Sequence, residues 1–186
     1  MTITKYIDKT SDTIRQLHSI EEEISEFSAM VYRTLKTGNK IIFCGNGGSA
    51  ADSQHLAAEL MGRFLKDRRP LPAIALTVDT SALTAIGNDY GYDEVFSRQL
   101  RGIGNEGDLL VGISTSGNSA NVIKAFHSAN SIGINTVAMT GNNSSVLSEL
   151  ATLTINAPSS ETNHIQECHI TIGHLVCKFV EEKMFK

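Results

Sequence analysis

Apolar residues repeat at helical spacing near both ends of the chain. Near the start, Ile20, Ile24, Phe27, Val31 and Leu35 follow one another at intervals of three or four residues, which places them on one face of a helix. Residues 2–37 are therefore predicted to be helical, in one or two segments. Apolar residues between 165 and 179 keep the same spacing. They predict a long final helix that ends near residue 182.

The middle of the chain alternates short apolar runs with longer amphipathic stretches. Strands are predicted at 41–44, 73–78, 109–113, 134–139 and 151–155. Helices are predicted at 50–64, 93–101, 119–131 and 144–150. Continuous apolar strands that alternate with helices are typical of a parallel sheet covered on both faces. The predicted fold class is α/β: a doubly wound, flavodoxin-like, five-stranded parallel sheet with helices on both faces and an N-terminal helical extension.

Length, charge and cysteine content narrow the class of protein. The 186 residues, without an internal repeat or linker, predict a single domain over 1–186. A net charge of −4 with scattered basic residues argues against a nucleic-acid partner. The three cysteines lack CxxC spacing, which argues against a disulfide framework or a thiolate zinc site and favours the cytoplasm. No signal peptide or membrane span is recognised, so we expect a soluble protein without a membrane partner.

Two turns with unusual composition follow predicted strands. They are Gly45-Asn46-Gly47-Gly48-Ser49 and Ser114-Thr115-Ser116-Gly117-Asn118-Ser119. Each opens a predicted helix, whose N-terminal N–H groups attract an anion. The second turn adds four hydroxyls, which are donors suited to a phosphate. Because the crevice of an open parallel sheet lies beyond the carboxyl ends of its strands, both turns are predicted to line one site for a phosphorylated sugar.

Each turn also has a simpler interpretation. The glycine turn fits the dinucleotide pattern G-x-G-x-x-A, with Asp79 as the acid for the ribose, or it is a tight turn that needs glycine only for positive φ. Asp79 lies farther along the chain than the usual spacing of about 20 residues, which disfavours the dinucleotide. The hydroxyl turn has the alternative of a solvated loop in which Ser119 is an ordinary N-cap.

Acid and base side chains lie at helical spacing on two predicted helices. His55 and Glu59 are four residues apart and share one face, which Arg63 continues. Gln166 and His174 lie about two turns apart on the final helix. A single helical His or Glu is commonly a surface residue, and a buried structural role for Gln166 is equally natural. Spacing alone does not bring the two helices together, and two neighbours on the final helix compete for the same role: Glu167 and His169.

Several segments together resemble the sugar isomerase (SIS) family, and in particular its members that act on heptose phosphates. These segments are 44–49, 55–63, 85–91, 112–121 and 165–167. The resemblance implies an aldose–ketose isomerase that converts sedoheptulose 7-phosphate to D-glycero-D-manno-heptose 7-phosphate, a step toward the heptoses of bacterial lipopolysaccharide or capsule. It also implies a homotetramer with sites at subunit interfaces and residues 1–37 packed between subunits.

The resemblance further implies roles for individual residues. Glu59 is the expected base and His174 the expected acid of an enediolate mechanism, which needs both groups and donors for the developing charge. The residues expected to hold the phosphate are Ser49, Ser114, Thr115, Ser116 and Ser119. Those expected to line the sugar are Asn46, Gly47, Gly48, Glu59, Asn88, Asp89 and Gln166. In members that bind zinc, the ligands fall at His55, Glu59, Gln166 and His174.

The chain departs from the family pattern at His164, where arginine is common, and in the segments 141–145 and 157–161. Two other functions remain open. One is a non-catalytic SIS protein that binds the bacterial replication initiator; such relatives lack the residues found here as Glu59 and His174. The other is an SIS isomerase or sensor for hexose or pentose phosphates, which the pair His55 and Glu59 disfavours.

Overall fold

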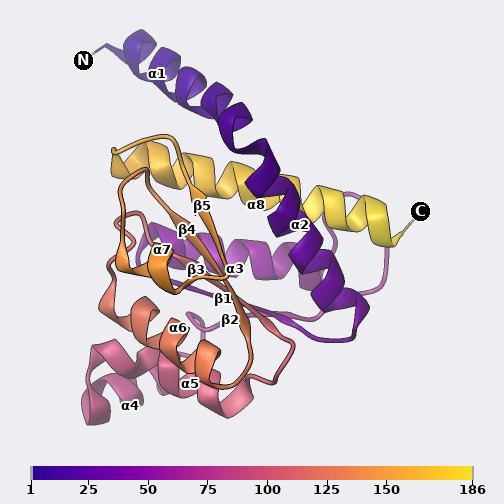
Figure 1. The fold of residues 1–186 in the computed structure, drawn as a ribbon, viewed down its shortest axis with the longest axis vertical. Helices are drawn as coiled ribbons and strands as arrows, with labels where there is room; N and C mark the ends of the chain where they lie inside the picture. Colours follow the sequence, from indigo (N-terminus) through magenta and orange to yellow (C-terminus); the bar gives the residue numbers. More distant parts are fainter. Residues whose placement is uncertain (1, 186) are drawn as a thin grey trace.

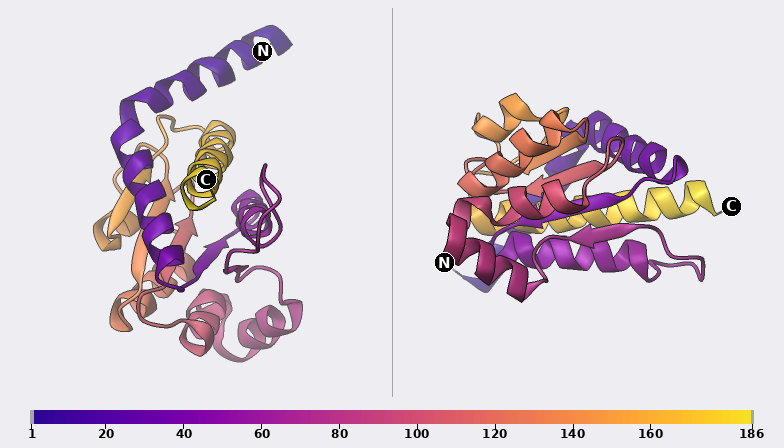
Figure 2. Two further views of the ribbon diagram at one scale, coloured as in Figure 1. Left: turned by 90° about the vertical axis from the view of Figure 1, so that its right-hand side faces the viewer. Right: turned by 90° about the horizontal axis from the view of Figure 1, so that it is seen from below.

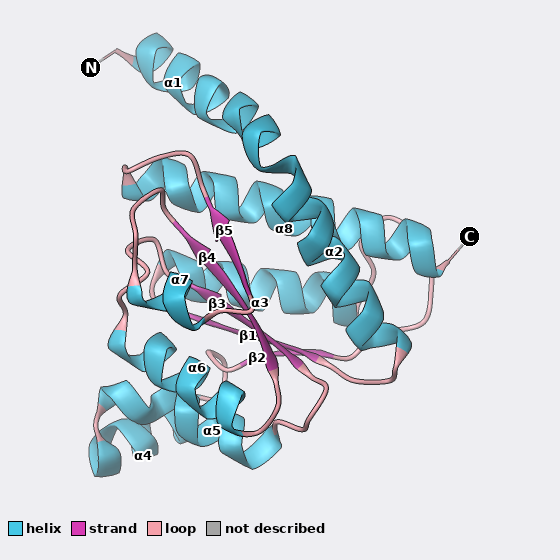
Figure 3. Cartoon of the chain, viewed as in Figure 1, coloured by secondary structure: helices cyan, strands magenta, loops and turns pink. Residues whose placement is uncertain are grey.

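The chain folds around a parallel sheet of five strands. The computed structural model describes residues 2–185; the two ends of the expected domain, residues 1 and 186, lie outside it. The strands are β1 Ile41–Gly45, β2 Ala73–Ala75, β3 Leu109–Ile113, β4 Asn135–Thr140 and β5 Leu153–Asn156. Their order is β2-β1-β3-β4-β5, and all neighbours are parallel (Figure 3). The predicted fold class is confirmed.

Helices cover both faces of this sheet (Figure 1). They are α1 Ile3–Arg15, α2 Glu21–Lys36, α3 Gly48–Met61, α4 Thr80–Tyr90, α5 Val95–Ile103, α6 Ala120–Ser131, α7 Val146–Leu150 and α8 Thr162–Met184, with 3-10 turns η1 Gln16–Ile20 and η2 Tyr92–Glu94. Because strand side chains alternate between faces, Ile41 and Phe43 of β1 join a core with α2, α3 and α8. Ile42 and Cys44 join a second core with α5 and α6.

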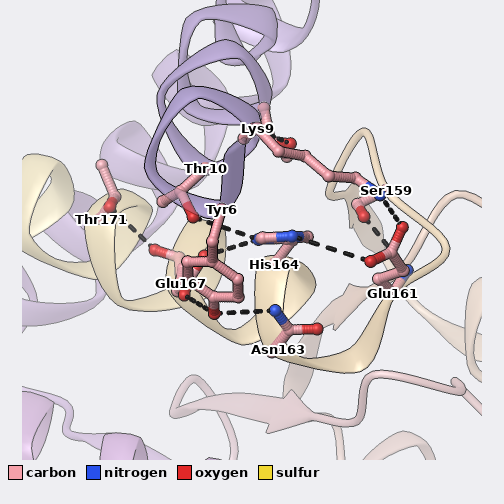
Figure 4. A network of polar contacts seen from close by, with 10 residues as sticks. Tyr6, Lys9, Thr10, Ser159, Glu161, Asn163, His164, Glu167 and Thr171 are labelled. Atoms are coloured by element: carbon pink, nitrogen blue, oxygen red, sulfur yellow. Dashed lines mark hydrogen bonds and ion pairs between the residues drawn. The ribbon is translucent and has the colours of Figure 1, made fainter. Parts of the chain in front are cut away.

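The N-terminal helices confirm the expected extension. The 3-10 turn η1 separates α1 from α2, and α1 extends away from the sheet (Figure 2, left). A polar network ties α1 to the start of α8 (Figure 4). In it, the Tyr6 hydroxyl donates to Glu167 Oε1 over 2.9 Å, His164 Nδ1 lies 2.9 Å from Glu167 Oε2, and Lys9 pairs with Glu161. Among residues 2–185, no helix is both long and apolar enough to cross a membrane.

The segment after β2 differs from the prediction. The strand predicted over 73–78 ends at Ala75, and helix α4, which was not predicted, follows. Asp79 is its N-cap, and the carboxylate accepts a hydrogen bond from the Ala82 N–H over 2.9 Å. The interpretation of Asp79 as a ribose-binding acid therefore loses its support, because that carboxylate caps a helix. No residue of α4 is fully buried, so its sequence carries no strong apolar period.

Candidate active site

Three side chains from two helices meet at one point. His55 and Glu59 lie on α3 and His174 on α8. The two imidazole Nε2 atoms are 2.8 Å apart, and His55 Nε2 is 3.3 Å from Glu59 Oε1. One ligand-type atom from each of the three residues lies within 4.8 Å of the other two. The structure thus brings together residues that spacing along the sequence could not join.

A glycine on α8 allows the two helices to approach. A Cβ built on Gly173 would lie 2.4 Å from a methyl carbon of Leu56, so a larger residue has no room there. Leu56 follows His55, and Gly173 precedes His174. The close packing of α3 on α8 (Figure 1; Figure 2, right) therefore sets the distance between the two imidazoles.

A buried ion pair fixes the far end of α3 against α8. The side chains of Arg68 and Glu181 are each 2% exposed and lie 3.1 Å apart. Arg68 also donates to the carbonyl oxygen of Glu59 over 2.8 Å. Burial raises the pKa of Glu181, but hydrogen bonds from the backbone N–H groups of residues 64–66 and from Arg68 outweigh it, so this pKa lies below its usual value. The Phe64 ring stacks on the His174 ring, with centroids 5.7 Å apart.

Gln166 lies beside the glycine turn, close to the start of α3. Its amide nitrogen donates to Asp52 Oδ1 over 2.7 Å, and a Cβ on Gly48 would lie 3.5 Å from its Cγ. Since the nitrogen is bonded to Asp52, the carbonyl oxygen is the end of Gln166 left to meet a ligand. Asp52, which was not among the predicted site residues, lies one turn before His55 on α3 and is 4% exposed. The sequence does contain a sign of Asp52: it is an acid three residues before His55, on the same face of the helix.

Burial raises the pKa of Asp52, while the hydrogen bond from Gln166 and the charge of His55 act in the opposite direction. Its second oxygen, Oδ2, has no hydrogen-bond partner among residues 2–185. Buried acceptors without a partner are uncommon, so Oδ2 remains able to accept a further hydrogen bond.

The two turns lie next to each other at the carboxyl ends of β1 and β3. A Cβ on Gly45 would lie 2.8 Å from the carbonyl oxygen of Ile113, so only glycine allows this approach. Asn46 and Asn121 exchange two amide hydrogen bonds of 2.8 and 2.9 Å, which tie the glycine turn to the first turn of α6. Gly47 has φ +56° and precedes α3.

The hydroxyls of the second turn gather at the N-terminus of α6. Ser114 Oγ lies 2.9 Å from Ser119 Oγ and 3.4 Å from Ser116 Oγ. Ser119 occupies the N-cap position of α6, but its side chain makes no capping hydrogen bond. The interpretation of its hydroxyl as an ordinary cap is therefore wrong. Gly117 has φ +65°, and a Cβ there would collide with Ser145.

The remaining candidates lie outside the cluster of His55, Glu59 and His174. Asn88 and Asp89 are exposed at the end of α4, where the Asn88 amide donates to Asp89 over 2.9 Å. Glu167 faces α1 in the network of Figure 4. His169 is fully buried and bonds the carbonyl oxygen of Thr140 over 3.0 Å, and burial lowers its pKa to about 4. Glu167 and His169 thus do not compete with Gln166 and His174.

Comparison with known proteins identifies the family of the chain. A model of the SIS domain family matches residues 5–141, and the chain belongs to this family. The phosphoheptose isomerase of Akkermansia muciniphila is 55% identical over 94% of this chain and 93% of that protein. The structure of phosphoheptose isomerase GmhA from Neisseria gonorrhoeae is 41% identical, with a TM-score of 0.91 over 97% of both chains. A phosphoheptose isomerase from Francisella tularensis is 33% identical, with a TM-score of 0.88 over 98% of this chain and all of that one.

Proposed function

We propose that this chain is an aldose–ketose isomerase that converts sedoheptulose 7-phosphate to D-glycero-D-manno-heptose 7-phosphate. The product would serve the synthesis of lipopolysaccharide or capsule heptose. The observation that carries the proposal is the meeting of Glu59, His55 and His174 from two helices in one partly exposed cluster. Gln166 connects this cluster region to the glycine turn. Similarity to proteins named phosphoheptose isomerase supports the choice of sugar.

The chain's own residues supply each part of the reaction. Glu59 takes the proton from C1 of the ketose and returns it to C2, while His174 moves a proton at the neighbouring oxygens. The phosphate is held at the N-termini of α3 and α6 by Ser49, Ser114, Thr115, Ser116 and Ser119. The sugar lies against Asn46, Gly47, Gly48, Glu59, Asn88, Asp89 and Gln166. Hydrogen-bond donors that face the oxygens of the enediolate lower the barrier to proton transfer, because negative charge develops on these oxygens.

The cluster also suits a zinc ion held by His55, Glu59, Gln166 and His174. Imidazole nitrogens and carboxylate oxygens are the donors that zinc prefers, although Gln is an uncommon ligand. With bonds of about 2.0–2.1 Å, tetrahedral ligand atoms lie roughly 3.3 Å apart, and the observed separations of 2.8 and 3.3 Å are close to this. Zinc, when bound, would stabilise negative charge on the sugar oxygens. Metal analysis should find zinc in the purified protein, and chelation should slow turnover; a fully active, metal-free preparation would refute the metal.

The proposal includes a cytoplasmic homotetramer of single SIS domains over 1–186, without a nucleic-acid or membrane partner. Residues 1–37 would pack between subunits. A groove of about 370 Å³ between α1, α2 and α8 supports this, because it is lined by apolar residues such as Leu17, Leu175 and Phe179. Leu175 and Phe179 are 47% and 43% exposed in the single chain. Light scattering after gel filtration should give the mass of four chains.

The substrate is tested by comparing sugar phosphates on the purified protein. Sedoheptulose 7-phosphate should be converted to the aldose, whereas fructose 6-phosphate and ribulose 5-phosphate should react at least roughly tenfold more slowly, since the site must fit a longer sugar. Preference for a hexose or pentose phosphate would favour the other SIS isomerases. Binding of sugar phosphates without turnover of any would favour a sensor.

A further inference from the structure

A tyrosine outside the residues assigned above contacts the glycine turn. Tyr92 is the first residue of η2, and its hydroxyl donates to Asn46 Oδ1 over 3.2 Å. Its side chain is not part of either core, and the residue is 62% exposed. A hydrogen bond at such an exposed position contributes little to folding. Its position beside a turn proposed to line the sugar suggests a role in binding instead.

The hydrogen bonds of Asn46 show what the tyrosine does. Asn46 Oδ1 accepts from Asn121 and from Tyr92, so both acceptor positions of this oxygen are used. Asn46 Nδ2 donates one hydrogen to Asn121 Oδ1 over 2.8 Å. Its second hydrogen has no partner among residues 2–185. The amide is thus held on one side by two neighbours and presents one free donor on the other.

The turn that carries Tyr92 is firmly anchored. Glu94 accepts hydrogen bonds from Ser97 over 2.5 Å and from Lys124 over 2.9 Å, and Lys124 lies on α6. The next residues, Val95 and Phe96, are 0% and 1% exposed. Gly91, at φ +90°, turns the chain between α4 and η2. Tyr92 therefore lies on a well-anchored turn between the end of α4, which carries Asn88 and Asp89, and the glycine turn.

We propose that Tyr92 is a positioning residue that orients the Asn46 amide, so that its free N–H donates to an oxygen of the bound sugar phosphate. This rests on the proposed function, in which Asn46 lines the sugar. Tyr92 acts on binding rather than on proton transfer, because its hydroxyl bonds to Asn46 and makes no hydrogen bond to His55, Glu59 or His174. Loss of the hydroxyl leaves Asn46 held by Asn121 alone.

The test removes the hydroxyl and keeps the ring. Tyr92→Phe should raise KM for sedoheptulose 7-phosphate by roughly three- to tenfold, the value of one hydrogen bond, with kcat within about twofold. The dissociation constant from calorimetry should rise by the same factor, and Tm should stay within about 2 °C. Tyr90→Phe is the matched control, since Tyr90 is 55% exposed and its ring faces Arg98. It should leave every one of these values unchanged.

A double variant separates an effect through Asn46 from a direct contact. In an Asn46→Ala background, Tyr92→Phe should have no further effect on KM or on the dissociation constant. An unchanged KM in Tyr92→Phe, a lower kcat at constant KM, or the same loss in both backgrounds would overturn the positioning role. Wild-type protein that binds sedoheptulose 7-phosphate but does not convert it would contradict the isomerase proposal alone. Wild-type protein that neither binds nor converts it would overturn both.

Discussion

Two histidines on the same helix differ in what surrounds them. His164, near the start of α8, is 1% exposed and lies 2.9 Å from Glu167 and 3.7 Å from Glu161, with the Tyr6 ring beside it. His174, about three turns further along, is partly exposed and faces another imidazole at 2.8 Å. The His164 ring is surrounded by hydrogen-bonding and aromatic partners within the protein. The His174 ring faces His55, with which it would hold a bound metal ion.

We expect this difference to separate a stabilising contact from a functional one. His164 is tied to Glu167 and Glu161 of its own helix and contacts Tyr6 and Thr10 of α1, so it helps to hold α1 against α8. His55 is exposed and His174 is partly exposed, and their Nε2 atoms lie 2.8 Å apart. A hydrogen bond between such exposed side chains adds little to stability. Imidazole and carboxylate groups that converge from two helices are candidates for a functional site. The two histidines should therefore respond in opposite ways to substitution.

The largest effect on turnover is expected at the cluster of His55, Glu59 and His174. Glu59→Gln and His174→Ala should each lower kcat for sedoheptulose 7-phosphate at least roughly a hundredfold, because each removes one partner in proton transfer. His164→Ala is the matched control and should stay within about threefold at a temperature where it is folded, since its ring faces α1. A coupled assay measures all three. Near wild-type turnover of Glu59→Gln or His174→Ala would remove that residue from its role.

A second effect is expected at the buried ion pair of Arg68 and Glu181. Glu181→Gln should lower the free energy of unfolding by about 3–5 kcal/mol, because it leaves the buried Arg68 guanidinium without its counter-charge. Urea unfolding followed by circular dichroism measures the change. Glu182→Gln is the control, because Glu182 is exposed, and should change it by less than about 0.5 kcal/mol. A loss of under 1 kcal/mol in Glu181→Gln would show that the ion pair does not hold α3 to α8.

Substitution of His164 should cause a smaller loss of stability than substitution of Glu181. His164→Ala should lower the free energy of unfolding by about 1.5–3 kcal/mol, since it removes hydrogen bonds to a charged partner, Glu167. The same unfolding experiment measures it. His174→Ala should cost less than His164→Ala, because His174 is partly exposed. The reverse order would contradict the contrast between the two sites.

The smallest effect comes from a third histidine on α8. Burial lowers the pKa of His169 to about 4 from its ordinary value of 6.5, so the unfolded chain binds its proton more readily. The stability that this group contributes is complete above pH 6.5 and is lost as the pH falls toward 4. Between pH 7 and pH 5 the loss should be about 1.5–2 kcal/mol. His169→Gln should reduce this slope and His127→Gln, at an exposed residue, should not. Equal slopes would contradict a neutral, buried His169.

Local patterns predicted most of the fold. Strands β1 and β3 and helix α6 were predicted within one residue at each end, because buried strands and an amphipathic helix carry their period in the sequence. Helix α4 was missed, since it buries no residue completely and contains Gly87. Helix α3 starts two residues before the prediction, because Gly47 and Gly48 lead directly into it.

The sequence predicted which helices carry the candidate site residues but not the contacts between them. The spacing of His55 and Glu59 identified one face of α3, and no local rule could bring His174 to it. That contact depends on Gly173 packing against Leu56, which are far apart in sequence. The same reason explains three contacts that were not predicted, because each joins residues from different elements. They are Asp52 with Gln166, Tyr92 with Asn46, and Arg68 with Glu181.

The central claim is that Glu59 and His174 move a proton between the first two carbons of sedoheptulose 7-phosphate. Nuclear magnetic resonance in D₂O follows it directly, because a proton that the base has taken from C1 exchanges with solvent before one is returned to C2. The account predicts that wild-type protein forms the aldose with deuterium at C2, and that Glu59→Gln incorporates deuterium at least roughly a hundredfold more slowly. Absence of the aldose with wild-type protein, or equal deuterium incorporation by wild type and Glu59→Gln, would contradict it.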